Sequence, residues 1–504
     1  MQTLLSDLRH ADAPQPHVAH LHVARPRTWP KRIAILSDYV RLPYANGATF
    51  ATQFLYRELT RRGHEVTIIG PDDPEAKPED LPERHICLPS LPLRNHPGVR
   101  VPLPLKGVME RAKSWDFDLI LGQTATELME LGMWMRHAKG TPILAVNTVH
   151  LPSVYPVVMP ESLHHNKTAH WAFQNSFLKI AEGASVRAYN AVDGLVVLSS
   201  GLERYWRERG VTAPIHVIPR NVEPKIFDAP ATHDPFPAHF RKGARLLVVC
   251  RHTREKGVER LLQIFARYVL AAVPEASLTL VGDGPDHDLF QRVAADLGVS
   301  ERTWFPGEFP VTTLPNFYRN ADLFTYTSLS ETYGQVVSEA LWCGLPAVAF
   351  ADDMGVSQQV EHEVSGLLVD PGPDEEMADW RFARAVVAVL RNPRRRATLA
   401  ANAALRARDR SAPEKMIERF LAAFEAAAEH ARNSAPPRGV DDLGLRARHT
   451  AQWMGINGIL LGLGLLRPPA VVNRHGRRQP AWDDLPPVGT HAPTADAADC
   501  SQGA

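Results

Sequence analysis

The chain has 504 residues, and its 56 Lys and Arg residues balance its 56 Asp and Glu residues, so the formal net charge is zero. Bulk nucleic-acid binders carry an excess of basic residues, so this balance argues against that class. The four cysteines lie far apart, which argues against a disulfide framework or a zinc ribbon, and the 22 histidines are scattered, so we expect no metal site. Because the chain has no secretory signal and no run of roughly 18–20 apolar residues, we expect a cytoplasmic protein.

Alternating strands and helices organise the first domain, which we expect over residues 31–222, after a flexible extension over residues 1–30. Apolar residues at helical spacing predict helices over residues 49–62 and 163–190. Short apolar runs predict buried parallel strands at residues 32–36, 66–69, 119–121, 143–146 and 194–198. This rhythm is typical of a Rossmann-like α/β domain with a parallel sheet.

The rhythm resumes after residues 223–243, which are rich in proline and lack a pattern, so we expect a linker there. The second domain is expected over residues 244–411, followed by a C-terminal helix over 412–432 and a tail over 433–504. Its predicted elements are strands at residues 245–249, 278–281, 323–325 and 347–350 and helices at residues 258–269 and 336–343. We therefore predict an α/β protein with two parallel-sheet domains.

The most informative segment of the second domain reads Ser-Glu-Thr-Tyr-Gly-Gln-Val-Val-Ser-Glu-Ala-Leu over residues 330–341. Gly334 permits close backbone approach at the start of a helix, and the N-terminal amides of a helix bind phosphate well. Glu331 and Glu339 flank this anion site, and carboxylates accept hydrogen bonds from sugar and ribose hydroxyls. Taken alone, the two glutamates are equally consistent with ordinary acidic residues at a helix start.

Two further loops follow strands of the same sheet. Arg251 and Lys256 lie on the loop after residues 245–249, and two cations at the carboxyl edge of a sheet suit a diphosphate. On its own, this pair would be two solvated surface cations. Gly282 begins a tight glycine-rich turn after the next strand, but His287 stands where a dinucleotide fingerprint needs its third glycine. A redox dehydrogenase is therefore a poor fit.

In this order and spacing, the three segments resemble the retaining glycosyltransferases of family 4, over roughly residues 31–430. The resemblance implies the GT-B fold, in which two Rossmann-like domains face each other across a cleft. It also implies a UDP- or GDP-sugar donor and no metal or other cofactor. By the same resemblance, Arg251 and Lys256 hold the diphosphate, Glu331 binds sugar hydroxyls and Glu339 binds the ribose. The expected donor site also includes Gly282, Gln335 and the backbone amides of Tyr333 and Gly334.

The first domain contributes three segments to this resemblance. Gly47 resembles the family's glycine that lets a loop approach the donor diphosphate, although a simple turn before a helix would look the same. His150 follows a strand where the family often has a histidine near the reacting sugar, although a lone histidine is usually structural. The turn at residues 219–223 resembles a Pro-Arg-Gly-Val-Asp motif of mannosyl- and lipid-directed members, with Asn221 in place of the glycine.

Residues 453–466 form the most apolar segment of the chain, and arginines lie on both sides of it. A stretch of this kind suits a shallow anchor on the inner face of a membrane, and its alternative is packing against the catalytic domains. We expect a retaining hexosyltransferase that acts on a membrane lipid or lipid-linked acceptor. Two alternatives stay open: the same chemistry on a soluble metabolite or polysaccharide, and an epimerase or sugar-binding protein of the same fold. No nucleic acid is expected as a partner.

Overall fold

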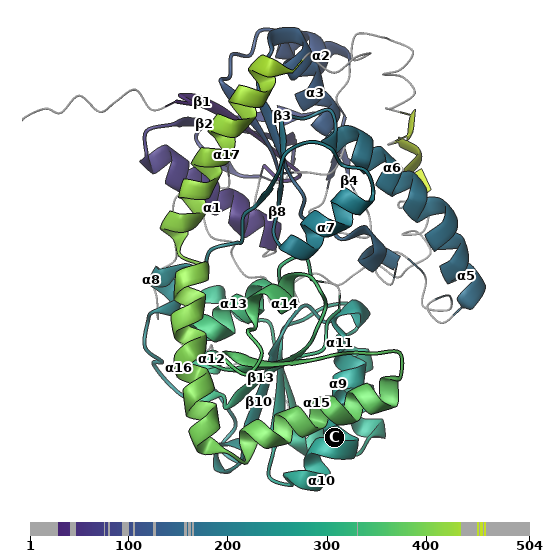
Figure 1. Ribbon diagram of the computed structural model, residues 1–504, viewed down its shortest axis with the longest axis vertical. Helices are drawn as coiled ribbons and strands as arrows, with labels where there is room; N and C mark the ends of the chain where they lie inside the picture. The colour runs from purple at the N-terminus through teal and green to yellow at the C-terminus, as the bar shows by residue number, and fades with distance from the viewer. Residues whose placement is uncertain are drawn as a thin grey trace, which may run out of the picture.

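The computed structural model describes residues 29–40, 47–74, 76–78, 81–92, 100–103, 106–123, 128–155, 159, 163, 166–329, 331–434, 451–452, 454–456 and 458–459. Within these residues the chain forms two lobes, each built on a parallel sheet covered by helices (Figure 1). The predicted fold class is confirmed.

The first sheet has seven parallel strands in the order β3-β2-β1-β6-β7-β8-β9. They are β1 (Arg32–Ser37), β2 (Glu65–Pro71), β3 (His85–Leu88), β6 (Leu119–Gln123), β7 (Ile143–Val146), β8 (Gly194–Val197) and β9 (Ile215–Val217). A separate antiparallel pair is formed by β4 (Ser90–Pro92) and β5 (Arg100–Pro102). The helices of this lobe are α1 (Gly47–Arg61), α2 (Lys106–Ala112), α3 (Leu128–Lys139), α5 (Lys167–Ala172), α6 (Leu178–Tyr189) and α7 (Ser200–Glu208). A π-helical turn at Phe173–Phe177 joins α5 to α6.

The second sheet has six parallel strands in the order β12-β11-β10-β13-β14-β15. They are β10 (Arg245–Val249), β11 (Ser277–Val281), β12 (Thr303–Gly307), β13 (Leu323–Tyr326), β14 (Ala347–Phe350) and β15 (Gly366–Val369). The helices around it are α8 (Pro224–Phe227), α9 (Val258–Ile264), α10 (Leu270–Ala272), α11 (His287–Asp296), α12 (Leu314–Asn320), α13 (Gln335–Trp342), α14 (Gly355–Gln359), α15 (Glu375–Leu390) and α16 (Pro393–Arg410).

The alternation of side chains along β1 explains why its apolar run forms a central strand. Successive side chains of a strand point to opposite faces of the sheet. Ile33 and Ile35 accordingly join the apolar cluster on one face, and Ala34 and Leu36 join the cluster on the other. Because both faces are covered, every position needs an apolar side chain, and a continuous run replaces the usual alternation.

The segment expected to be a linker, residues 223–243, instead packs on the second lobe. It contains α8, and Phe227, Phe236 and Phe240 are buried in the core of the second domain. The last helix, α17 (Pro413–Asn433), returns to the first lobe, where Ile417, Phe420 and other apolar residues complete the cluster around β1. Figure 1 shows α16 and α17 running in succession along one side of both lobes.

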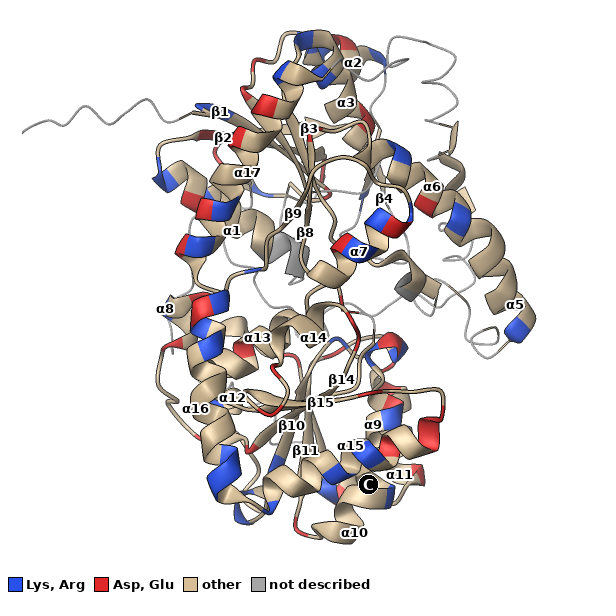
Figure 2. Cartoon of the chain, viewed as in Figure 1, with Lys and Arg blue, Asp and Glu red and all other residues tan. Residues whose placement is uncertain are grey.

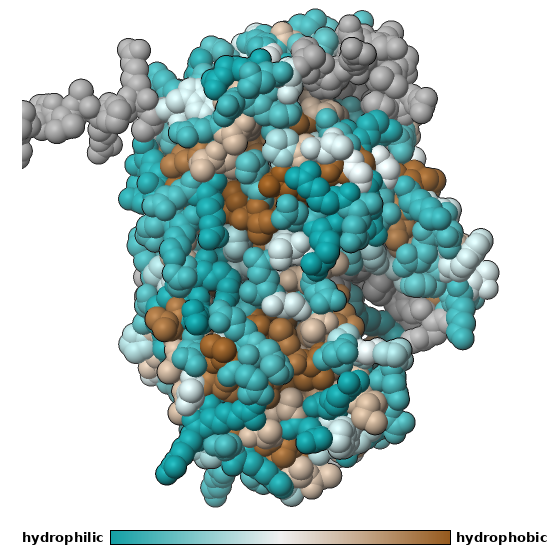
Figure 3. Space-filling model, viewed as in Figure 1, coloured by the Kyte–Doolittle hydropathy of each residue, from teal (hydrophilic) through white to brown (hydrophobic). Residues whose placement is uncertain are grey.

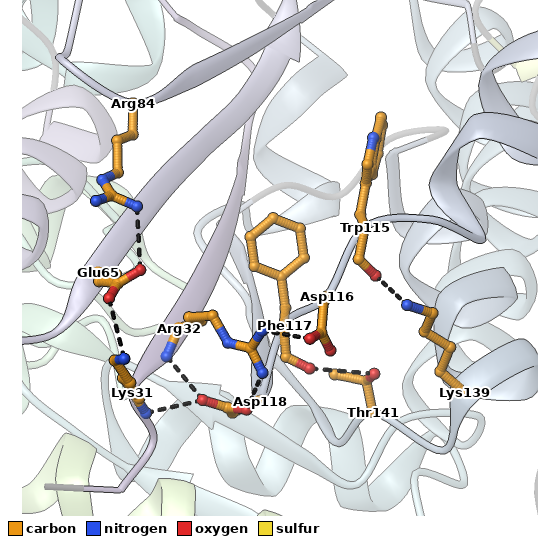
Figure 4. A network of polar contacts seen from close by, with 10 residues as sticks. All are labelled: Lys31, Arg32, Glu65, Arg84, Trp115, Asp116, Phe117, Asp118, Lys139 and Thr141. Carbon is orange, nitrogen blue, oxygen red and sulfur yellow. Dashed lines mark hydrogen bonds and ion pairs between the residues drawn. The ribbon is translucent and has the colours of Figure 1, made fainter. Parts of the chain in front are cut away.

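Charged residues at the amino edge of the first sheet hold the starts of its strands together (Figure 4). Arg32 forms ion pairs with Asp116 and Asp118, and the Asp118 carboxylate also accepts the backbone N–H of Arg32 at 2.8 Å. Glu65 Oε2 lies 3.1 Å from Arg84 Nη1. This network sits at the edge opposite the carboxyl ends of the strands, so it serves the fold and is separate from the candidate site. Among the described residues, no helix is both long and apolar enough to cross a bilayer.

Candidate active site

An ion pair between a half-buried lysine and a buried glutamate joins two loops at the carboxyl edge of the second sheet. Lys256 follows β10 and Glu331 follows β13, and Lys256 Nζ lies 2.5 Å from Glu331 Oε1. The same oxygen accepts hydrogen bonds from the Tyr326 hydroxyl at 2.8 Å and the Ser328 hydroxyl at 2.9 Å. Two residues that are far apart in the sequence therefore form a direct contact, because β10 and β13 are neighbours in the sheet.

The charges of this pair stabilise each other. Burial alone would raise the pKa of Glu331, but the Lys256 charge and the hydrogen bonds from Lys256, Tyr326 and Ser328 outweigh it, so the pKa lies below its ordinary value. Burial would likewise lower the pKa of Lys256, and the charges of Glu331 and Glu255 raise it instead. The site therefore holds a carboxylate and an ammonium group at neutral pH.

Helix α13 begins beside this pair. Gly334 is its N-cap and has a φ of 81°, a left-handed conformation that glycine adopts without strain. The carbonyls of Tyr333 and Gly334 both accept hydrogen bonds from the Gln359 side chain, at 3.3 Å for Gly334, which fixes the loop before the helix. Since the first N–H groups of a helix have no partner within it, they form a fixed site for an anion.

Glu339 and Gln335, the two residues of α13 that we expect to bind the nucleotide-sugar, have different surroundings. Glu339 is buried, and its Oε2 accepts a hydrogen bond from the Tyr318 hydroxyl at 3.0 Å. Burial raises the pKa of Glu339 to about 8, against the effect of that hydrogen bond. Gln335 donates a hydrogen bond from Nε2 to the Asn221 carbonyl at 2.9 Å, which holds the turn between the lobes. Its Oε1 is buried and accepts no hydrogen bond from any described residue.

The glycine-rich turn after β11 packs directly on the loop that carries Arg251. Gly282 has a φ of 134°, and a Cβ there would overlap the Cys250 carbonyl oxygen. The next residue, Asp283, accepts the His252 N–H through its carbonyl at 2.9 Å. Arg251 itself is exposed, and no described residue forms an ion pair with it. The turn thus supports the loop, and the Arg251 guanidinium is available to a ligand.

A buried histidine pair, which the sequence reasoning missed, connects the same two loops. His252 Nδ1 and His287 Nδ1 lie 2.9 Å apart, so one ring donates a hydrogen bond to the other. Burial, followed by the effect of His287, lowers the pKa of His252 to about 3, so this ring is neutral at neutral pH. His287 stands where a dinucleotide fingerprint has its third glycine, and nothing in the sequence pattern indicates its contact with His252.

The first lobe approaches the site through the loop after β7. Thr332 donates a hydrogen bond to the Thr148 carbonyl at 3.4 Å, so this loop contacts the residue that follows Glu331. His150 lies two residues further on and meets the Tyr205 ring edge to face at 5.1 Å. Burial and the Arg209 charge lower the pKa of His150 to about 4, so its imidazole is neutral at neutral pH.

Gly47 is the first residue of α1, directly after the β1 loop. The preceding residues 41–46 lie outside the described residues, so the approach of that loop to a ligand stays a prediction. The arrangement as a whole offers cations and helix amides for an anion, and a carboxylate for hydroxyl groups. Within the described ranges, no group of three His, Cys, Asp or Glu residues could hold a metal ion.

A partly apolar surface extends beside the first lobe, formed by α5, α6 and residues 454–456 and 458–459; we call it the α5–α6 arm. Trp171 on α5 is 66% exposed and Ile180 on α6 is 50% exposed. Ile456 packs on Ala181 and Ala184 of α6, whereas the remaining apolar segment, from residue 460 onward, lies outside the described residues. Figure 2 shows Lys and Arg on α5 and α6, and Figure 3 shows apolar surface at the same edge.

Two family models match the chain, one on each lobe. The model described as Glycosyltransferase Family 4 matches residues 45–225, and the model described as Glycosyl transferases group 1 matches residues 232–406. Together they match more than two thirds of the chain.

Curated relatives and solved structures agree with these matches. The chain is 26% identical to an alpha-monoglucosyldiacylglycerol synthase of Streptococcus pneumoniae, over 67% of this chain and 78% of the relative. It is 27% identical to a GDP-mannose-dependent alpha-mannosyltransferase of Mycobacterium tuberculosis, over 68% of this chain and 85% of the relative.

Among solved structures, sucrose-phosphate synthase from Thermosynechococcus elongatus has a TM-score of 0.60 at 22% identity and covers 78% of this chain and 98% of its own. Anabaena HepE in complex with UDP and glucose has a TM-score of 0.59 at 18% identity, over 79% of this chain and 100% of its own. These likenesses show that the two lobes have the GT-B fold. The chain belongs to the glycosyltransferases, with a family 4 first domain and a group 1 second domain.

Proposed function

We propose that this protein is a retaining hexosyltransferase that moves a hexose from a UDP- or GDP-sugar to a hydroxyl of a membrane lipid or lipid-linked acceptor, without a metal. The observation that carries the proposal is the Lys256–Glu331 ion pair beside the N-terminus of α13. It combines groups for a diphosphate with a carboxylate for sugar hydroxyls at one edge of a sheet. A protein that only binds a sugar would not need fixed cations that stabilise a leaving group, whereas an epimerase that expels the diphosphate would, so only the transfer assay separates it from a transferase.

In the proposed reaction, the bond between the anomeric carbon and the diphosphate oxygen breaks, and the diphosphate leaves with the bonding electrons. Arg251, Lys256 and the first amides of α13 stabilise the negative charge that develops there. The acceptor oxygen bonds to the anomeric carbon on the same face, and its proton passes to the leaving diphosphate. The uncharged His150 imidazole and the Glu331 carboxylate hydrogen-bond the sugar hydroxyls and hold the ring in place.

Two observations support a lipid acceptor over a soluble one. The relatives include an alpha-monoglucosyldiacylglycerol synthase and a GDP-mannose-dependent alpha-(1-6)-phosphatidylinositol monomannoside mannosyltransferase. The α5–α6 arm carries exposed Trp171 and Ile180 together with Lys167 and Lys179, and such a surface suits the interface of an anionic membrane. We propose a peripheral protein on the cytoplasmic face of the membrane.

A transfer assay read by mass spectrometry tests the proposal. The wild-type protein is offered UDP- and GDP-hexoses with diacylglycerol, a glycolipid extract and simple soluble acceptors, and Glu331→Gln serves as the inactive control. Hexose on a lipid that is absent with the control supports the proposal. If hexose is found only on a soluble acceptor, the lipid acceptor is wrong and the soluble-acceptor alternative takes its place. If the protein binds the nucleotide but transfers no hexose, the transferase proposal is overturned.

A separate experiment tests the membrane contact. Trp171→Ala/Ile180→Ala is compared with Trp380→Ala, which removes a 41% exposed tryptophan from α15 of the second lobe. We expect co-sedimentation with phosphatidylglycerol vesicles to fall only for the α5–α6 variant. Equal binding by all three proteins would contradict the assignment of this arm.

A further inference from the structure

Arg220 is a buried cation that no described residue neutralises. It lies in the turn between β9 and α8, where the chain passes from the first lobe to the second. The residue is only 9% exposed, and no described residue forms an ion pair with its guanidinium. Buried charges in proteins are normally paired, because an unpaired one loses its hydration without compensation.

A second buried arginine shows how this fold treats such a charge elsewhere. Arg136 on α3 is 3% exposed, and its Nε lies 2.6 Å from Asp193 Oδ2. Its Nη2 donates to Asp193 Oδ1 at 2.7 Å, so the guanidinium is held by both oxygens of one carboxylate. Among the described residues, no carboxylate neutralises Arg220 in the way that Asp193 neutralises Arg136, which points to a partner outside them.

The main chain around Arg220 is fixed against the candidate anion site. The Arg220 carbonyl accepts a hydrogen bond from the Tyr333 hydroxyl at 3.1 Å, and the Asn221 carbonyl accepts one from Gln335 Nε2 at 2.9 Å. Tyr333 and Gln335 flank Gly334, where α13 begins. Arg220 is therefore held next to the loop that starts the helix, on the strand of chain that joins the two lobes.

The electrostatics agree with a missing anion. Burial lowers the pKa of Arg220 to about 10, and Tyr333 and Glu331 offset this only in part. Glu331 is already paired with Lys256 at 2.5 Å, so it is not free to neutralise a second cation. A guanidinium presents two parallel N–H groups, a geometry that matches two oxygens of one phosphate group.

We propose that Arg220 binds a phosphate group of the bound substrate, as a third cation beside Arg251 and Lys256. The inference rests on the proposed function, and it assigns the phosphate to the donor diphosphate. A phosphate on the acceptor is the other source of the same chemistry. In this account the ligand-free protein carries an uncompensated charge that the substrate neutralises, so removing the charge stabilises the empty protein and weakens binding.

The test compares Arg220→Met, Arg220→Lys and Arg136→Met with the full-length wild type. Thermal unfolding is measured without ligand, and calorimetry measures the affinity for UDP and GDP in the absence of acceptor. We expect Arg220→Met to unfold at the wild-type temperature or above and to bind the preferred nucleotide at least tenfold more weakly, with part of the affinity restored in Arg220→Lys. Arg136→Met should unfold at a lower temperature, because it leaves Asp193 buried without its partner.

Two results would overturn the inference. One is a loss of thermal stability in Arg220→Met like that in Arg136→Met, which would assign Arg220 to the fold. The other is an unchanged nucleotide affinity together with unchanged KM values for donor and acceptor. If the nucleotide affinity is unchanged but the KM for a phosphate-bearing acceptor rises, Arg220 binds the phosphate of the acceptor and not that of the donor.

Inorganic pyrophosphate separates this inference from the proposed function. If the wild type transfers no sugar but pyrophosphate raises its unfolding temperature, and does so less in Arg220→Met, the phosphate site stands and the transferase proposal fails. If the wild type transfers sugar and pyrophosphate stabilises Arg220→Met as much as the wild type, the transferase proposal stands and the Arg220 site fails. If neither nucleotide nor pyrophosphate stabilises the wild type, the Arg220 site is refuted.

Discussion

Removing Lys256 isolates the buried carboxylate of Glu331 and gives the clearest energetic test of the site. In Lys256→Met, Glu331 keeps the hydroxyls of Tyr326 and Ser328 at 2.8 and 2.9 Å but loses its counter-charge at 2.5 Å. Breaking a buried ion pair on one side costs about 3–5 kcal/mol, and the two remaining donors favour the lower end. In a domain of this size about 3 kcal/mol lowers the unfolding temperature by roughly 6–12 °C.

The stability difference between Lys256→Met and the wild type should depend on pH in a predictable direction. In the wild type the pKa of Glu331 is lowered, so its contribution to stability is present at neutral pH and is lost as the pH falls through that pKa. In Lys256→Met only burial and hydroxyl hydrogen bonds remain, and burial raises the pKa. The folded variant then binds a proton more readily than the unfolded chain does, so it gains stability as the pH falls from 7 towards 5. The deficit relative to the wild type should shrink over that interval.

Scanning calorimetry at pH 5, 6 and 7 measures this deficit. Lys256→Met/Glu331→Gln is the control, and it should recover part of the lost stability because it removes the unpaired carboxylate. An unfolding temperature of Lys256→Met within about 2 °C of the wild type at pH 7, or a deficit that does not change with pH, would refute the reasoning.

Three further predictions concern individual contacts. Gly282→Ala should lower the unfolding temperature far more than Gly63→Ala, because both glycines have positive φ but only a Cβ at Gly282 meets another atom. In the wild type, the folded protein keeps the Glu339 proton up to its pKa of about 8, so the free energy of unfolding should fall as the pH rises from 4.5 to 8. Glu339→Gln should abolish this fall, which urea titrations at several pH values measure. Tyr333→Phe should cost about 1–3 kcal/mol by chemical denaturation, because its hydroxyl bonds the Arg220 carbonyl and the Ser411 hydroxyl.

The central strands could be predicted from the sequence, and the edge strands could not. The runs that become β1, β6, β10 and β14 are buried on both faces, so each is apolar throughout and stands out. β3 and β9 lie at the edges of the first sheet and are half exposed, so they carry no such run. The same reasoning applies to residues 223–243, where Phe236 and Phe240 are isolated apolar residues without any period, so their packing in the second core could not be predicted.

The site divides in a similar way. Strand order places the loops of Lys256 and Glu331 at one edge, and a motif is enough to find them. The partners of those residues are set by packing between segments far apart in the chain, as for His252 with His287, and for Arg220 with Tyr333. Neither residue type nor spacing predicts such contacts, so only the structure shows the histidine pair and the arginine that no described residue neutralises.

The central claim is that the carboxyl edge of the second sheet binds the diphosphate of a nucleotide-sugar. Calorimetric titration of the wild type and Arg251→Met with UDP and GDP tests it most directly, because Arg251 is exposed and forms no ion pair with a described residue, so its removal leaves the fold intact. We predict that the wild type binds one of the two nucleotides at a single site and that Arg251→Met binds it at least tenfold more weakly. Equal binding by both proteins, or no binding of either nucleotide by the wild type, would contradict the claim.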